Sequence, residues 1–104
     1  MGLFSGFSNK KVTEFAEELA QHITRDLPPN LLLKSRSPIS ANRITTILER
    51  SYAKAAQFQT EHNVGSIRRA VMANAFRWKL TELGYPEEFV GVATEGLLVS
   101  LSKK

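Results

Sequence analysis

The segment AVMANAFRWKL, residues 70–80, decides the fold that we expect of this chain. Apolar side chains recur along it and its flanks at the spacing of an α-helix. They occupy two opposite faces of that helix, with Ile67, Val71 and Trp78 on one and Met72, Phe76 and Leu83 on the other. A helix that is apolar on opposite faces belongs in the middle of a packed domain. We therefore predict that this helix is central and that Trp78 is buried.

Turn-forming residues bound this helix on both sides. Asn63 and Gly65 tolerate a positive φ angle, so the preceding helix should end there and the central helix should begin near Ser66. Gly84 closes the central helix, and Pro86 suits the first position of the next one. The two glutamates that follow Pro86 favour the positive end of a helix dipole. These signals make the boundary near residue 84 the clearest in the chain.

Two further apolar stripes precede the central helix. The first begins at Val12, and Pro28 and Pro29 end its helix. It consists of Val12, Phe15, Ala16, Leu19, Ile23 and Leu27. The second lies on a long helix over residues 41–62, with Ser40 as its expected N-cap. It consists of Ile44, Ile47, Leu48, Ser51, Ala55 and Phe58. Each stripe predicts an amphipathic helix that packs one face on the core.

The last stripe follows Pro86 and consists of Phe89, Ala93, Leu97 and Leu101. Gly91 and Gly96 weaken this helix by roughly 1 kcal/mol each relative to alanine. Because glycine has no side chain, either position could admit a neighbouring helix closely. A strand at residues 97–101 is the less favoured alternative.

The sequence thus predicts an all-α fold, a compact single domain over residues 1–104 with about four helices and the third helix central. Residues 1–9 form an apolar N-terminal arm, and residues 28–39 form a proline-bounded loop.

The arm begins MGLFSGFSNKK, residues 1–11. Its lysines follow the apolar part and Ser5 interrupts that part, which argues against a secretory signal peptide. A myristoylation signal would need Ser or Thr at the sixth position, which is Gly6. Its three large apolar side chains are Leu3, Phe4 and Phe7. We expect them to pack on the domain, with shallow insertion into a membrane or a partner as the alternative.

Composition excludes several classes of protein. The chain has 42% apolar residues and no cysteine, so it can bury a modest core, and it has neither a disulfide scaffold nor a thiolate site. No run approaches the roughly 18 apolar residues of a transmembrane segment. We expect a cytoplasmic protein.

Basic residues are concentrated in the middle of the chain. Between residues 34 and 79, nine Lys and Arg stand against two Glu, a net charge of +7, whereas the whole chain carries +4. Clustered positive charge favours nucleic acid or an acidic protein surface. The candidate partner-binding residues are Arg43, Arg50, Lys54, Arg68, Arg69 and Arg77. The alternative is that these side chains are the solvated faces of amphipathic helices.

Little in the sequence points to catalysis. The common nucleotide-binding, metalloprotease and hydrolase motifs are absent. His22 has Glu18 and Asp26 four residues to either side, but one helix rarely presents three converging metal ligands. His62 lies near the end of its helix, where an imidazolium suits the dipole, so we expect it to act as a cap.

Asn74 and Arg77 project near one another from the central helix. Polar groups on so apolar a helix must find partners or lie beneath a cleft. We expect an internal tether, with a pocket for a small anion as the alternative. From these observations we predict a noncatalytic interaction module without a cofactor, which binds a protein partner or self-associates through a helical surface. The alternative is a nucleic-acid-binding protein that uses the basic region 34–79.

Overall fold

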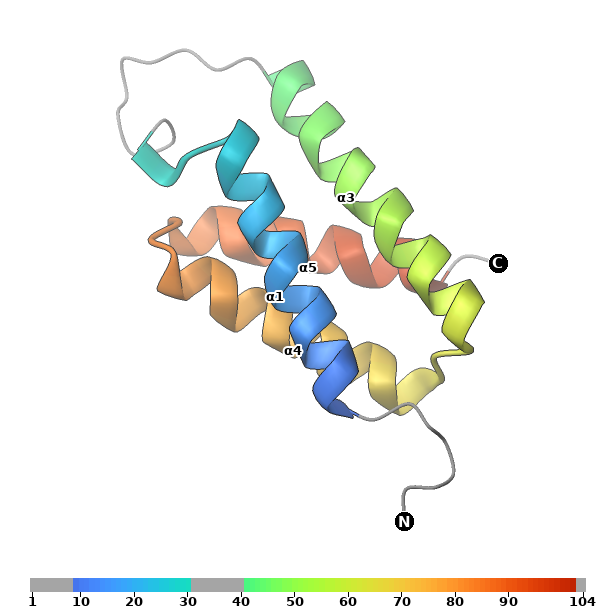
Figure 1. Cartoon of the computed structure of the whole chain (residues 1–104). Coiled ribbons are helices and arrows are strands. Elements are labelled where there is room, and N and C mark those ends of the chain that lie inside the picture. Colours follow the sequence, from blue (N-terminus) through green and yellow to red (C-terminus); the bar gives the residue numbers. More distant parts are fainter. Residues whose placement is uncertain (1–8, 31–40, 103–104) are drawn as a thin grey trace.

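The computed structural model describes residues 9–30 and 41–102, and within these residues it contains long helices and no strand (Figure 1). The long helices are α1 (Asn9–Asp26), α3 (Ala41–His62), α4 (Ser66–Glu82) and α5 (Glu87–Ser102). The predicted all-α class is confirmed, and residues 97–101 are helical.

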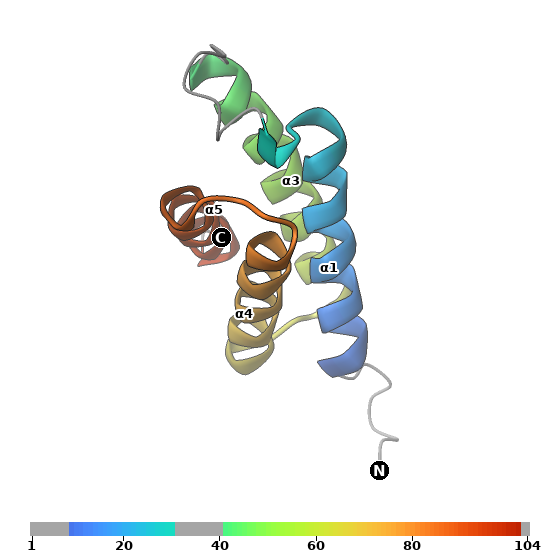
Figure 2. The same ribbon diagram turned by 90° about the vertical axis from the view of Figure 1, so that its left-hand side faces the viewer.

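The helices enclose one core. Helix α4 packs against both α1 and α5, and α3 completes the bundle by contacting both α1 and α5. Figure 2 shows α5 nearly end-on while α1 and α4 are seen from the side, so α5 crosses this pair. The predicted central position of the third long helix, α4, is confirmed because α4 packs against both the first helix, α1, and the last helix, α5.

The predicted apolar stripes supply this core. From α1 they bury Val12, Ala16, Leu19 and Ile23; from α3, Ile47, Leu48, Ser51 and Ala55; and from α5, Ala93, Leu97 and Leu101. Ser51 is the polar member of its stripe, and its hydroxyl donates to the carbonyl of Ile47, 3.4 Å away. The spacing of apolar residues therefore identified the inward faces of three helices correctly.

The prediction that Trp78 is buried is wrong. Met72 and Phe76 are fully buried, but on the opposite face of α4 the side chains of Ile67 and Trp78 are 79% and 62% exposed. The physical reason is that both neighbours of α4 cover the face that carries Phe76. Of the described residues on the other face, Val71 packs partly against the core, whereas Ile67 and Trp78 are exposed. A helix can thus be central in its packing and still leave apolar side chains in solvent.

The turns lie close to where the sequence placed them. Asn63 has a φ angle of 51° and Gly84 one of 101°, so both adopt the left-handed conformation. Gly65 instead is extended, with φ −83° and ψ −177°, and it precedes α4. Pro86 also precedes its helix: its carbonyl accepts a hydrogen bond from the amide of Val90, 3.0 Å away.

A tyrosine in the turn between α4 and α5 secures the end of α1. The Tyr85 hydroxyl donates to the backbone carbonyl of Leu27 and lies 3.3 Å from the hydroxyl of Thr24. Burial raises the pKa of Tyr85. This contact joins residues far apart in sequence, and the sequence analysis did not predict it.

Some predictions concern residues that the structure does not describe. The apolar arm lies outside the described residues except for Asn9, and so do residues 31–39 of the proline-bounded loop and the expected N-cap Ser40. Across residues 9–30 and 41–102, no helix combines the length and the apolar character that a membrane crossing needs.

Candidate interaction groove

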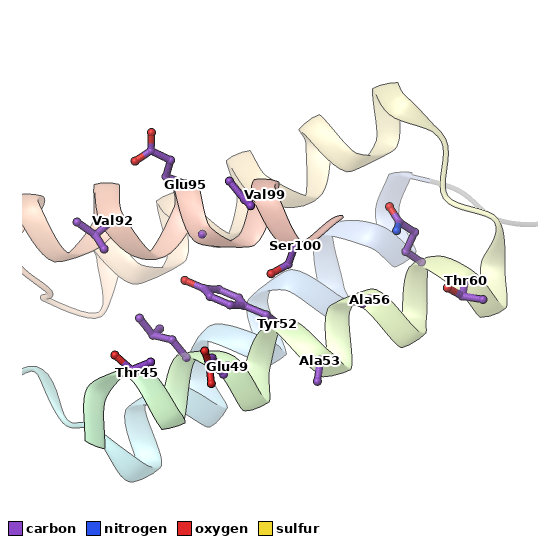
Figure 3. Close-up of a pocket in the computed structure, with 13 residues that line it drawn as sticks. Thr45, Glu49, Tyr52, Ala53, Ala56, Thr60, Val92, Glu95, Val99 and Ser100 are labelled. Atoms are coloured by element: carbon purple, nitrogen blue, oxygen red, sulfur yellow. The ribbon is translucent and has the colours of Figure 1, made fainter. Parts of the chain in front are cut away.

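A groove of about 900 Å³ runs between α3 and α5 (Figure 3). Small residues line both of its sides, with Ala53 and Ala56 from α3 and Gly96 from α5. The α3 residues of the groove recur every three or four positions, so they form one flank of that helix. Ala53 and Ala56 leave room for a neighbouring backbone, so the groove has the character of a site for a packed helix.

Tyr52 holds the two walls of the groove together. Its hydroxyl donates to the carbonyl of Ala93 across the helix boundary, at 2.9 Å. Its ring lies over Gly96, where an added Cβ would be 2.3 Å from the hydroxyl oxygen. Burial, and secondarily the charge of Glu49, raises the pKa of Tyr52 to about 12. The helix–helix contact thus needs both the phenol and the glycine.

The glycine prediction is confirmed at one position. Gly96 admits the α3 side chain of Tyr52, whereas a Cβ added at Gly91 would meet nothing within 4 Å. The two glycines of α5 are therefore different in kind: Gly96 is required by packing, and Gly91 lies on the open side of the helix.

The groove is apolar along α5 and acidic in charge. Val92 and Val99 line it, and their side chains are 59% and 53% exposed. Glu49 and Glu95 add a carboxylate from each wall, and none of the described lining residues is Lys or Arg. Exposed apolar surface beside fixed charge is typical of a binding surface.

The basic candidates on α3 share one flank. Arg43, Arg50 and Lys54 are all exposed, and their spacing of seven and four residues places them on the same side of the helix. That flank differs from the one that lines the groove, because none of the three is among the groove residues.

The basic candidates on α4 lie in separate surroundings. Arg69 is half-buried, and its guanidinium donates to the carbonyl of Leu101 at 3.1 Å, near the C-terminus of α5. A cation there suits the helix dipole, so Arg69 has a structural role. Arg68 is also half-buried, whereas Arg77 is exposed and borders a hollow that also contains Glu87 and Glu88. The structure therefore does not bring the six candidates onto one continuous surface.

The remaining polar candidates are Asn74, His22 and His62. Asn74 and His22 are exposed. The ring of His62 packs against Phe58 at a centroid distance of 4.6 Å. In the described part of the chain, no three His, Cys, Asp or Glu side chains are grouped so that they could hold a metal ion.

Sequence reasoning missed the groove itself. It identified Gly96 as a place of close approach, but it did not single out Tyr52, Val92 or Val99. One signal was available, since Val92 and Val99 lie seven residues apart and off the apolar stripe of α5. No family model, curated protein or solved structure was found to match this chain.

Proposed function

We propose that this protein is a noncatalytic interaction module that binds a protein partner through the groove between α3 and α5. The observation that carries the proposal is the pair of exposed valines, Val92 and Val99, along a groove of about 900 Å³. Burial of exposed apolar side chains by a partner releases water and is the main driving force of protein association.

The chemistry of the groove favours a helical ligand. Ala53 and Ala56 allow close approach of a backbone. The exposed valines of the groove lie seven residues apart along one helix, which suits the two-turn repeat of another helix. Its carboxylates, from Glu49 and Glu95, favour positive charge on the ligand. The preferred partner is therefore an amphipathic helix with basic residues beside its apolar face.

The surroundings of the two tyrosines support a noncatalytic function. Tyr52 and Tyr85, whose pKa values are raised, both donate to backbone carbonyls and so join helices. A perturbed pKa at such a position reflects packing, not chemistry at a reaction centre. The chain contains no cysteine and so no disulfide that would need an oxidising compartment. The proposal therefore includes a cytoplasmic location.

The test compares proteins captured from the native cells by the wild type and by a doubly substituted variant, Val92→Glu with Val99→Glu. Both residues are largely exposed, so the variant should melt at the same temperature as the wild type. We expect it to lose the captured protein. A control with Arg43→Glu and Arg50→Glu, on the other flank of α3, should retain it. Equal capture by the wild type and the valine variant would contradict the proposal.

The alternative function is nucleic-acid binding through the exposed basic flank of α3. The supporting observation is that Arg43, Arg50 and Lys54 share that flank. Gel shifts with duplex DNA and RNA at low salt test it, because phosphate contacts lose affinity steeply as salt rises. If the alternative holds, Arg43→Glu with Arg50→Glu abolishes the shift and Val92→Glu with Val99→Glu preserves it. No shift by the wild type would exclude it.

A further inference from the structure

A second apolar surface lies on α4. Ile67 and Trp78 are the exposed large apolar side chains of this helix, and they are eleven residues apart. Val71, which is half-buried against the core, and the exposed Asn74 fall between them. The four positions are three or four residues apart and so form one helical face, which we call the α4 stripe. This is the spacing of a helix that packs along another helix.

The α4 stripe and the groove have opposite charge. Helix α4 contains four basic residues and one acidic residue, a net charge of +3, and of the four basic residues Arg69 is bound at the end of α5. The groove contains two acidic residues, Glu49 and Glu95, and no Lys or Arg among the residues that line it, a net charge of −2. The ammonium of Lys79 lies 3.2 Å from the carboxylate of Glu82, whereas Arg77 is exposed beside Trp78. The α4 stripe is thus apolar with basic flanks, which is the character that the groove favours.

We propose that the groove between α3 and α5 binds the α4 stripe of a second copy of this chain. The proposal rests on the proposed function and names its partner. Contact between two α4 stripes would place basic flanks together, and contact between two grooves would place Glu49 and Glu95 against their copies. The crossed pairing of stripe with groove is the one that brings opposite charges together.

The dimensions agree with this pairing. From Ile67 to Trp78 the α4 stripe is about 16 Å long at the rise of an α-helix. The groove follows α3 from Thr45 to Thr60, about 22 Å by the same rise. The stripe therefore fits within the length of the groove.

One polar residue, Asn74, lies in the middle of the α4 stripe and is exposed. A single polar residue within an apolar seam is a known means of fixing register, so Asn74 would favour one alignment of the stripe in the groove.

The two surfaces are connected along one side of the molecule. Trp78, Arg77 and Gly91 border one hollow. Arg77 and Gly91 also border the next hollow, together with Val92 and Glu95, which in turn line the groove. A surface that is basic at one edge and acidic at the other is complementary to a second copy of itself after a two-fold rotation. That rotation would place the α4 stripe of each copy in the groove of the other copy. We therefore expect a closed dimer.

Sedimentation of the purified protein over a concentration series tests the dimer. The wild type should move from the monomer mass of 11.6 kDa towards twice that mass. Arg77→Glu alone, or Glu49→Arg with Glu95→Arg, should each weaken the dimer by about tenfold or more because each places like charges in contact. Arg50→Glu, which changes charge on the other flank of α3, should leave the dimer unchanged and serves as the control.

A mixture of the two variants provides the decisive measurement. When Arg77→Glu is mixed with the variant that carries Glu49→Arg and Glu95→Arg, every stripe again meets a groove of opposite charge. The mixture should therefore dimerise more tightly than either variant alone. Unchanged melting temperatures would show that all the variants are folded. A wild type that stays monomeric, or a mixture without rescue, would overturn this proposal. In either case, capture of another protein that depends on Val92 and Val99 would leave the proposed function standing.

Discussion

Helix α1 contains six apolar residues, counting alanine, and α4 contains nine, and the two helices distribute them differently. In α1 they form one stripe, and Val12, Leu19 and Ile23 are buried. In α4 they occupy opposite faces, and burial reaches Phe76 but not Trp78. This difference shows that a single apolar stripe identifies the buried face of a helix. When a helix carries two apolar stripes, the sequence does not indicate which of them is buried within the domain. The second stripe of α4 leaves Ile67 and Trp78 in solvent.

The largest effect that we expect comes from the buried face of α4. Phe76→Ala should lower the free energy of unfolding by about 3–5 kcal/mol, since it removes a fully buried ring and leaves a cavity. Urea denaturation measures the change. A loss no greater than that of an exposed substitution such as Asn74→Ala would show that α4 is not oriented as described.

The two glycines of α5 extend the comparison from helices to single positions. Gly96→Ala should destabilise the protein by about 1–3 kcal/mol, because the added Cβ forces Tyr52 away from Ala93. Gly91→Ala is the matched control: its Cβ meets nothing, so it should stabilise the helix by up to about 1 kcal/mol. Thermal melts of the two variants should therefore shift in opposite directions. Similar shifts would contradict the packing of Tyr52 on Gly96.

We expect the stability of the protein at high pH to depend on Tyr52, the tyrosine that joins α3 to α5. The pKa of Tyr52 is about 12 in the folded protein, against an ordinary value of 10.0 that applies to the unfolded chain. Between these values the folded state holds a proton that the unfolded state has lost, so stability is full below pH 10 and falls as the pH rises towards 12. Melting temperatures of wild type and Tyr52→Phe measure this loss. The decline should be shallower in Tyr52→Phe, and parallel declines would contradict it.

The smallest effect should come from the exposed face of α4. Trp78→Ala should change the free energy of unfolding of the monomer by about 0.5 kcal/mol or less, because its side chain is already 62% exposed. Denaturation at low protein concentration isolates the monomer. The change can be compared directly with that of Phe76→Ala, because the two aromatic residues are two positions apart on one helix. A loss of several kcal/mol would place Trp78 in the core after all.

The candidate groove was less predictable than the fold. Gly96 carried a usable signal because a glycine within a helix calls for a packing reason. Tyr52 carried none, since at the border of its stripe a tyrosine is equally compatible with solvent or with a cross-helix contact. The basic residues were conspicuous in the sequence, but their number did not reveal that Arg69 is used to bind the end of α5.

The sequence by itself determined the helices, their ends near Gly84 and Pro28, and the inward faces of α1, α3 and α5. These features follow from local rules, namely the backbone preferences of turn residues and the periodic spacing of apolar side chains along each helix. Only the tertiary structure decided which face of α4 is covered, that Tyr52 crosses to Ala93, and that the groove of α3 and α5 is lined by carboxylates. Those features depend on how helices far apart in the chain are placed, and periodicity within one helix contains no information about its neighbours.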